Sequence, residues 1–232
     1  MGCVCTENTN DQYSIEDILD VGVYENDKNN INSKLKLSEY VKKVFFLINK
    51  IRTNPTKFAE IVTNSEQYIK QIGERKIFDH KLKVALNEGQ KMFEDCAEYL
   101  RNLSPMPELI FNDEIVLECP KEPNNIKDIN FFKQKVTEKN ETQKLEAYFK
   151  DSIQEPDISV LLMIVDDSPK NPRKKRLAVL NPNYKFIGIS SSDIDDISTN
   201  DENKNQNNNG NNNENGTPTP NKKPFCAYFA FK

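Results

Sequence analysis

Two helices meet in the segment Phe46-Leu47-Ile48-Asn49-Lys50-Ile51-Arg52-Thr53-Asn54-Pro55-Thr56-Lys57-Phe58-Ala59. The first is expected to begin after Ser38, a residue type that caps helices. Its apolar residues fall at helical spacing and predict one buried stripe: Val41, Val44, Phe45, Ile48 and Ile51. Asn54-Pro55 should end it, because proline disfavours a helical residue before it and suits the first position of the next helix. That second helix should turn Phe58, Ile61 and Val62 inward.

Further along the chain, the pattern predicts one more long helix and two strands. Apolar spacing favours a helix from Lys81 to Leu103, stopped by Ser104-Pro105-Met106-Pro107. Residues 120 to 142 are charged and show no clear period, so no element is assigned to them. Tyr184 to Ser190 and Phe225 to Phe231 are dense in aromatic and β-branched residues and predict two paired strands, the second covered on both faces.

Residues 193 to 223 lie between these strands and contain a run of asparagines from Asn205 to Asn213 interrupted by Gln206 and Gly210. Such a segment has almost nothing to bury, and we expect a disordered insertion in a β-hairpin. Asparagine tracts can also aggregate, which leaves an interaction role as an alternative.

Composition and charge limit the classes of protein that fit. Of 232 residues, 36% are hydrophobic, and the mean hydropathy of -0.74 indicates that part of the chain is solvated. The first 36 residues hold seven acidic and three basic residues; removing them from the totals of 36 and 32 leaves 29 of each sign. A neutral body argues against nucleic acid as a partner, since a nucleic-acid binder presents a basic face.

The five cysteines, Cys3, Cys5, Cys96, Cys119 and Cys226, are odd in number and follow no secretory signal. We therefore expect reduced thiols and an intracellular location. The longest strongly apolar runs, Val44 to Ile48 and Val160 to Val165, are far shorter than the roughly 20 residues of a membrane-spanning helix. Membrane attachment would need an anchor.

The N-terminus supplies such an anchor. Met1-Gly2-Cys3-Val4-Cys5-Thr6 fits the pattern M-G-x-x-x-[ST] for myristoylation of Gly2, and it places Cys3 and Cys5 where palmitate can be added. One myristoyl chain binds a membrane only marginally and needs a second signal. The adjoining segment is acidic and anionic lipid would repel it, so palmitoylation is the expected second signal. The alternative is a chance Met-Gly start with two idle cysteines.

Three segments together resemble the CAP superfamily, the fold of cysteine-rich secretory, antigen-5 and pathogenesis-related-1 proteins. The first is Phe46 to Ala59, similar to a family pattern I-N-x-x-R-x-N-P-x-x-F-A. The second is Ala97 to Leu100 with Pro107 to Ile115, where Phe111 takes an aromatic position. The third is Leu161 to Asp167, Arg173 to Pro182 and Phe186 to Ile189 with a final aromatic strand. Residues 116 to 145 match nothing in the family.

The resemblance implies an α+β fold, a three-layer α/β/α sandwich with a mainly antiparallel central sheet. It would comprise residues 37 to 192 and 224 to 232, behind an acylated flexible tail of residues 1 to 36. It also implies that Ile158 to Val165, a strand by composition, is a helix starting at Glu155-Pro156-Asp157.

CAP proteins carry a cleft in which two histidines and two acidic residues can bind a divalent metal. Lys175 stands at the second histidine position and has no lone pair to offer when protonated. Glu146 and Asp166 would remain of the family cleft. His80, the single histidine, matches no motif and is too poorly placed to activate a nucleophile. We therefore expect no catalytic residues, no tight metal site and no cofactor.

A basic cluster borders the expected cleft and consists of Lys170, Arg173, Lys174, Lys175 and Arg176. It could bind anionic lipid head groups or acidic protein surfaces. The alternative is a solvated loop.

Two functions fit these features. The first is a non-catalytic CAP-like binding or scaffold protein held by its acyl chains on the cytoplasmic face of a membrane, such as the ciliary, Golgi or plasma membrane, with protein partners expected. The second is a structural component of a ciliary, axonemal or other cytoskeletal assembly that uses the fold as a docking module. A secreted CAP protein would need a signal peptide and paired cysteines.

Overall fold

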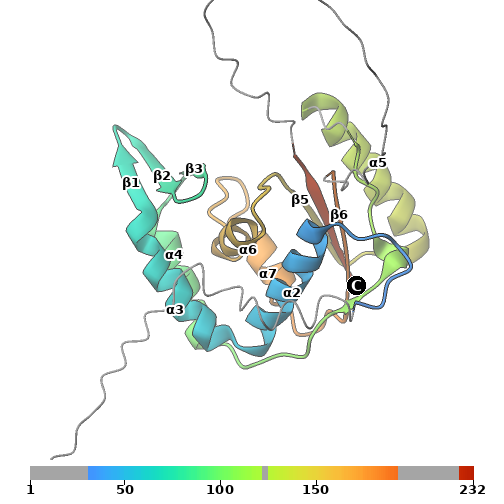
Figure 1. Cartoon of the computed structure of the whole chain (residues 1–232), viewed down its shortest axis with the longest axis horizontal. Coiled ribbons are helices and arrows are strands. Elements are labelled where there is room, and N and C mark those ends of the chain that lie inside the picture. Colours follow the sequence, from blue (N-terminus) through green and yellow to red (C-terminus); the bar gives the residue numbers. More distant parts are fainter. Residues whose placement is uncertain (1–30, 122–124, 193–224) are drawn as a thin grey trace, which may run out of the picture.

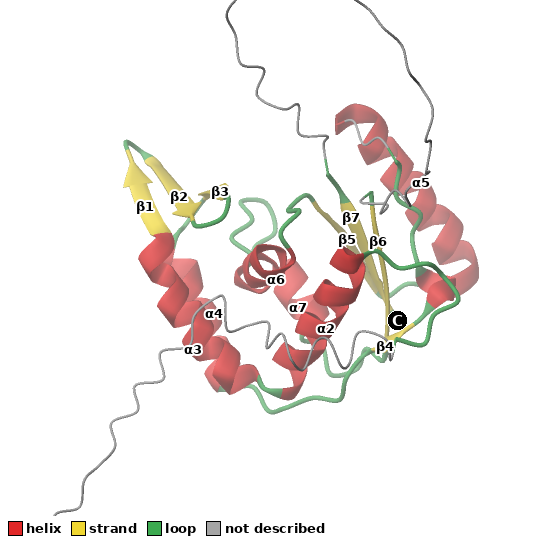
Figure 2. Cartoon of the chain, in the orientation of Figure 1, coloured by secondary structure: helices red, strands yellow, loops and turns green. Residues whose placement is uncertain are grey.

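The computed structural model describes residues 31–121, 125–192 and 225–232, with only the backbone of residues 125–128. These residues form an α+β fold with two separate β-sheets and helices packed around them (Figure 1). Figure 2 shows the smaller sheet at one side of the molecule and the larger sheet at the other, with helices between them.

The first helix begins and ends where the sequence predicts, and the second begins where it predicts. Helix α2 spans Glu39–Thr53, and the Ser38 hydroxyl accepts a hydrogen bond of 3.3 Å from the Val41 amide. Helix α3 spans Pro55–Ser65, with Pro55 in its first turn and the Asn54 side chain accepting from the Lys57 amide. The predicted helix pair is confirmed.

The predicted helix from Lys81 to Leu103 is wrong in its first third. A short 3-10 helix η3, Glu66–Tyr68, leads into an antiparallel sheet of β1, Ile69–Ile72, β2, Arg75–Asp79, and β3, Lys83–Leu86. Helix α4 begins only at Gln90 and ends at Arg101. Gly89 separates the two elements with a φ of +66°, a conformation that glycine adopts without strain.

The larger sheet has the strand order β4-β6-β7-β5. Its strands are β4, Ile110–Phe111, β5, Ala147–Asp151, β6, Phe186–Ser191, and β7, Ala227–Phe231. Strand β4 runs parallel to β6, and the other neighbours are antiparallel. The predicted pairing of the last two strands is confirmed, with Ile187 opposite Phe231, and β7 is buried along its whole length.

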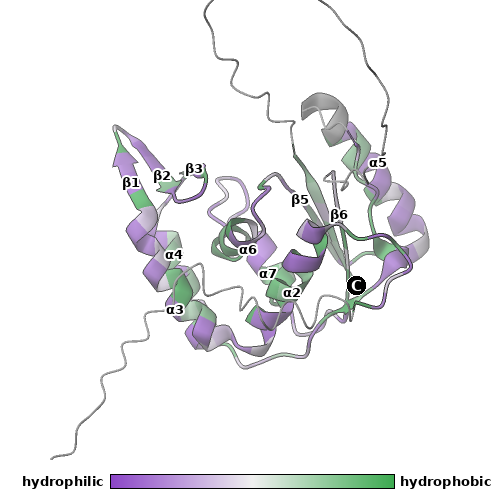
Figure 3. Ribbon diagram, viewed as in Figure 1, coloured by the Kyte–Doolittle hydropathy of each residue, from purple (hydrophilic) through white to green (hydrophobic). Residues whose placement is uncertain are grey.

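Helices lie on both faces of this sheet. Alternate residues of β7, Ala227, Phe229 and Phe231, belong to the larger core with α2 and with α6, Pro156–Val165. Figure 3 shows α6 as mostly hydrophobic. The start of α6 at Pro156 is the one expected from the resemblance. Helix α7, Lys174–Val179, follows it on the same face.

The opposite face of the sheet carries a smaller core that includes Leu117, Val136, Tyr228 and Ala230. It is covered by α5, Asn125–Gln143, which lies in the region left unassigned from sequence (Figure 1). The short helix η4, Asp113–Ile115, lies near one end of α5. A Cβ on Gly188 of β6 would lie 2.7 Å from the Val116 amide nitrogen, so glycine is needed where η4 meets the sheet.

The folded part begins before the predicted boundary at residue 37. Ile31 packs against the larger core, and Asp113 accepts hydrogen bonds from the Ser33 hydroxyl and the Lys34 amide. The predicted tail is therefore too long by at least six residues. Gly2, Cys3 and Cys5 and the predicted insertion at 193 to 223 lie outside the described residues.

Candidate functional site

Lys175 reaches from α7 to the end of β5. Its ammonium lies 3.0 Å from a carboxylate oxygen of Asp151 and 5.7 Å from the centre of the Phe149 ring. The Asp151 side chain is 6% exposed and that of Lys175 is 27% exposed. The position that the resemblance assigns to a histidine therefore holds one half of an ion pair near the surface.

Two hydroxyl groups extend this ion pair into the core. Ser159 donates to the second carboxylate oxygen of Asp151 at 2.6 Å, and the Tyr40 hydroxyl lies 2.9 Å from the Ser159 hydroxyl. Burial raises the pKa of Tyr40 well above its ordinary value. Ser159 is fully buried and Tyr40 is 3% exposed, so a substrate could reach neither hydroxyl without local opening.

The two aspartates that follow α6 hold the starts of two other helices. Asp166, in a left-handed conformation, accepts a hydrogen bond of 2.6 Å from the Lys175 amide at the start of α7. Asp167 accepts from the amides of Asn87, Glu88 and Gly89 just before α4. Burial raises the pKa of Asp166, although the Lys175 amide and ammonium act against that shift.

Glu146 does not join Asp166. It is exposed at the start of β5, and its amide donates to the Phe231 carbonyl. Asp151 lies at the other end of the strand, roughly 16 Å away at the rise of a β-strand. The expected acidic pair of Glu146 and Asp166 is therefore corrected, since the acid beside Lys175 is Asp151.

Metal ligands are not gathered elsewhere in the described ranges, where no group of three or more His, Cys, Asp or Glu side chains is placed to hold an ion. His80 lies in the connection between β2 and β3, with its ring centre 4.3 Å from that of Tyr68 in an edge-on contact.

Most residues of the basic cluster form ion pairs with aspartates of the same chain. Arg173 forms a two-bond contact with Asp95, and Arg176, only 1% exposed, binds the same carboxylate and the carbonyls of Ile164 and Val165. Among the described residues, Lys170 and Lys174 are the members of the cluster that contact no carboxylate. The expectation of a five-residue anion site is corrected to two exposed lysines, of which Lys174 lies over the Tyr148 ring.

Asn49 and Arg52 are two polar residues of the first motif whose side chains bind other segments of the chain. They lie three residues apart on one face of α2 and both hold the extended segment that leads to β4. The Asn49 amide exchanges two hydrogen bonds with the Leu109 backbone, and Arg52 donates to the Pro107 carbonyl. Arg52 also donates to the carbonyls of Val179, Asn181 and Tyr184, so it joins the first motif to the third.

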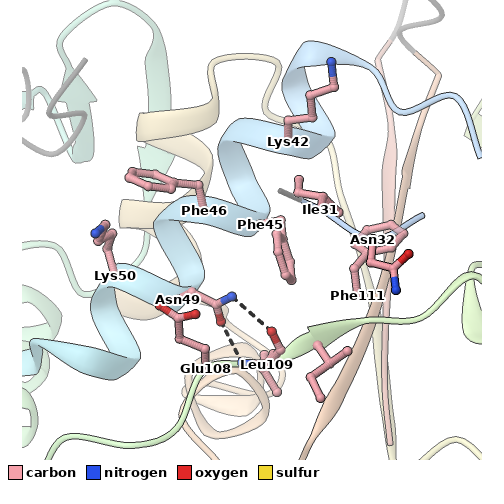
Figure 4. Close-up of a pocket in the computed structure, with 11 residues that line it drawn as sticks. Ile31, Asn32, Lys42, Phe45, Phe46, Asn49, Lys50, Glu108, Leu109 and Phe111 are labelled. Carbon is pink, nitrogen blue, oxygen red and sulfur yellow. Dashed lines mark hydrogen bonds between the residues drawn. The ribbon is translucent and has the colours of Figure 1, made fainter. Parts of the chain in front are cut away.

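The same face of α2 borders an open pocket of about 450 Å³ that the sequence analysis missed (Figure 4). Its other walls come from Ile31 and Asn32 and from residues 108–111. Figure 4 shows Phe45 pointing from α2 toward Phe111, and the two rings meet edge to face at 5.5 Å. Ile110 is 58% exposed beside them. No sequence signal could indicate this pocket, because its walls are far apart in the chain.

Two lysines of α2 line this pocket at different heights along the helix axis. Lys42 and Lys50 are eight residues apart on α2, which corresponds to about 12 Å along the helix axis. Lys42 is paired with Glu39 at 2.8 Å, and the Lys50 ammonium lies 4.9 Å from the Phe46 ring centre. Glu108 is the one acidic residue in the lining. The pocket thus combines aromatic and aliphatic walls with a modest excess of positive charge.

Comparison with protein-family models, with curated proteins and with solved structures gave no match. Within the described ranges, no helix combines the length and the apolar character that crossing a membrane requires.

Proposed function

We propose that this chain is a non-catalytic binding module with a CAP-like fold, held on the cytoplasmic face of a membrane by acylation of Gly2 and of Cys3 or Cys5. Proteins or lipids at that membrane would be its partners, and the near-neutral body does not favour nucleic acid.

Support for the CAP-like fold comes from the way in which the resembling motifs meet. Arg52 of the first motif binds three carbonyls in and beside the third, and Asn49 fixes the second. These residues are adjacent in the structure although they are up to 132 positions apart in the chain. Helices on both faces of a mainly antiparallel sheet agree with the same fold.

The observation that carries the non-catalytic role is the network around Lys175. A catalytic or metal-binding cleft needs accessible groups with unused lone pairs or protons. Here the Asp151 carboxylate already accepts from Lys175 and Ser159, and Asp166 accepts from the Lys175 amide. These contacts stabilise the junction of β5, α6 and α7, which is a structural role.

The α2 pocket is the candidate ligand site of the described residues. Its volume lies within the usual range for small-molecule sites, and its walls combine apolar and polar residues in nearly equal numbers. Lys42 and Lys50 would favour a negative group beside an apolar chain or ring. An anionic amphiphile, such as a phospholipid, has this chemistry, and it is available at the membrane surface to which the acyl chains would hold the domain.

Membrane fractionation of the Gly2→Ala variant tests the anchor. The variant should move to the soluble fraction, whereas Val4→Ala, which keeps the acylation pattern, should remain with membranes. Replacing both Cys3 and Cys5 by serine should weaken retention, because one myristoyl chain binds only marginally. Continued pelleting of Gly2→Ala would contradict acyl anchoring and favour attachment through a protein assembly such as the cytoskeleton.

Vesicle binding of the unacylated Gly2→Ala protein tests the pocket separately from the anchor. We expect it to bind vesicles that contain phosphatidylserine more strongly than vesicles of phosphatidylcholine alone. Lys42→Gln with Lys50→Gln should reduce that binding about thirtyfold, at roughly 1 kcal/mol for each basic residue near the surface. Lys91→Gln, an exposed lysine of α4, is the matched control. Equal binding of the pocket variant and the control would remove the pocket from the proposal while leaving the anchor intact.

A further inference from the structure

Two cysteines that are distant in sequence lie side by side on the α5 face of the larger sheet. The sulfur atoms of Cys119 and Cys226 are 2.7 Å apart, although the residues are 107 positions apart in the chain. Cys119 follows η4 on the segment that leads toward α5, and Cys226 directly precedes β7. Both are thiols in this structure.

Hydrogen bonds position Cys226 and the segment that carries Cys119. Cys226 and Ser192 are joined twice: the Ser192 amide donates to the Cys226 carbonyl at 2.9 Å, and the Cys226 amide donates to the Ser192 hydroxyl at 3.0 Å. The Cys119 thiol also lies 3.4 Å from the Cys226 carbonyl oxygen. Nearby, the Ser190 hydroxyl donates to the Leu117 carbonyl, which fixes the chain two residues before Cys119 on β6. A bond between the sulfurs, about 2.05 Å long, needs an approach of less than 1 Å.

The two thiols differ in exposure and in acidity. Cys226 is fully buried, whereas Cys119 is partly exposed and can meet a reagent from solution. The hydrogen bond from the Cys119 thiol lowers the pKa of Cys226 and raises the pKa of Cys119, and the nearby positive charge of Lys150 lowers both. By contrast, burial raises the pKa of Cys96 to about 12, and its thiol donates to the Ile164 carbonyl in the larger core.

We propose that Cys119 and Cys226 are a redox site that forms a reversible intramolecular disulfide by exchange with a low-molecular-weight disulfide such as oxidised glutathione. Cys119, the partly exposed thiol, loses its proton to solvent, and the resulting thiolate attacks one sulfur of the reagent, which releases one glutathione thiolate. The Cys226 sulfur then loses its proton, attacks the Cys119 sulfur and displaces the second glutathione thiolate. Two protons leave the protein and neutralise the two released thiolates, and two electrons reduce the reagent.

The bond would tie the segment before α5 to the start of β7. A crosslink that closes a loop of more than one hundred residues restricts the unfolded chain strongly. It also fixes one border of the smaller core, to which Cys226 itself belongs. The oxidised form should therefore hold α5 against the sheet more firmly than the reduced form, without a change in fold.

Equilibration of the full-length chain with glutathione buffers of increasing oxidised fraction tests the proposal, with Cys3 and Cys5 replaced by serine to remove the tail thiols. After alkylation of the remaining thiols, peptide mapping should show a Cys119 to Cys226 linkage that a dithiol reductant reverses. The melting temperature should rise by on the order of 10 °C when the linkage forms. Cys96→Ser should change neither result.

Single variants check the proposed order of attack. Cys226→Ser should accumulate a glutathione adduct on Cys119, because the resolving thiol is missing, whereas Cys119→Ser should leave Cys226 unmodified at the same buffer ratio. The proposal is overturned if both thiols of the parent protein are still alkylated at a large excess of oxidised glutathione, or if the adduct forms first on Cys226. These results do not depend on membrane attachment.

Discussion

Two arginine side chains are buried in the core. Arg52 and Arg176 are each 1% exposed, although arginine is almost always at the surface unless it is paired. Arg52 donates to four backbone carbonyls, and Arg176 donates to two carbonyls and the Asp95 carboxylate. Burial lowers the pKa of Arg52. Because the pKa of arginine is ordinarily far above 7, the guanidinium stays charged at neutral pH.

Arg52→Lys should destabilise the protein although it keeps the charge. A lysine ammonium is a compact charge that cannot match the planar set of donors, so several buried carbonyls would lose their partner. We expect a loss of about 3 kcal/mol in the free energy of unfolding, measured by urea denaturation. Arg101→Lys is the control, because Arg101 is exposed and contacts the Thr63 hydroxyl. Equal denaturation midpoints for the two variants would contradict the role assigned to Arg52.

Asp95 should make stability fall in acid. Burial alone would raise its pKa, but hydrogen bonds and charge from Arg176 and Arg173 outweigh burial and lower it. The folded state therefore binds this proton more weakly than the unfolded chain, so the contribution of Asp95 is full above a pH of about 4 and is lost as the pH falls below that value.

Asp95→Asn tests this linkage. The variant should be less stable than wild type at pH 7 by about 1 kcal/mol, after allowance for solvent screening of a partly exposed group. It should also lose less stability than wild type between pH 5 and pH 3 in urea denaturation, values chosen to bracket the ordinary carboxyl range of about 4. Glu98→Gln, an exposed acid on the same helix, should keep the wild-type pH dependence. An unchanged slope in Asp95→Asn would show that other carboxyl groups dominate.

Zinc should not be retained in stoichiometric amount. The ammonium of Lys175 lies where the resemblance places a histidine ligand, and Asp151 is bound to it. Metal analysis after dialysis against a weak chelator is the measurement, and a Lys175→Met variant serves as the comparison because it removes the competing cation. Zinc that persists at one ion per chain in the wild-type protein would require ligands other than these residues.

At the scale of elements, capping and proline signals predicted the helices well. Ser38 and Asn54 lie at helix starts, as their residue types indicate, whereas the helix that starts at Pro156 was expected only from the resemblance because its composition indicates a strand. The failure at Lys81 to Leu103 has a physical cause, because Leu82 and Leu86 fit helical spacing by chance while β3 is held by pairing with β2. Gly73, with a φ of +60° in the turn between β1 and β2, was the available signal for this hairpin.

Helix α5 escaped prediction for a different reason. It covers the smaller core, and of its described side chains Phe131, Phe132 and Val136 contact that core. Its apolar stripe is therefore narrow and its period weak.

The site residues were predicted less well than the elements. The resemblance placed Lys175 and Asp166 in one cleft, and the backbone amide of Lys175 donates a hydrogen bond to the Asp166 carboxylate. Composition could not show that Arg173 and Arg176 turn toward Asp95, or that Asp151 and not Glu146 faces Lys175, because these contacts depend on tertiary packing.

Strand β7 should be indispensable, whereas the long segment before it should not be. All five residues of β7 are buried between β6 and β5, so a chain ended after Pro224 should fail to fold. Deletion of residues 198–220 should change the melting temperature by only a few degrees, because loop closure costs about 0.6 kcal/mol for each doubling of loop length. Circular dichroism melting curves of both variants are the measurement. A cooperative transition at the wild-type temperature in the truncated chain would contradict the central position of β7.

The whole molecule is organised around the larger sheet, with unequal amounts of packing on its two faces. The larger core contains α2, α3, α4, α6 and α7 residues, whereas the smaller core depends on α5 and on the segment around Leu117. The three-stranded sheet lies at one side of the molecule and contributes Phe78 of β2 to the larger core (Figure 1). Most of the buried apolar surface, and with it most of the stability, therefore belongs to one side.

This asymmetry should give the protein two levels of protection against amide hydrogen exchange. Side chains of β7 alternate between the cores, so the strand keeps the larger core even when α5 detaches. Amides of α5 should then exchange with solvent through a local opening that costs much less than global unfolding, while amides of β6 and β7 exchange only when the entire domain unfolds. The molecule would thus behave as one cooperative unit of larger core and sheet, with a helix that can leave and return independently.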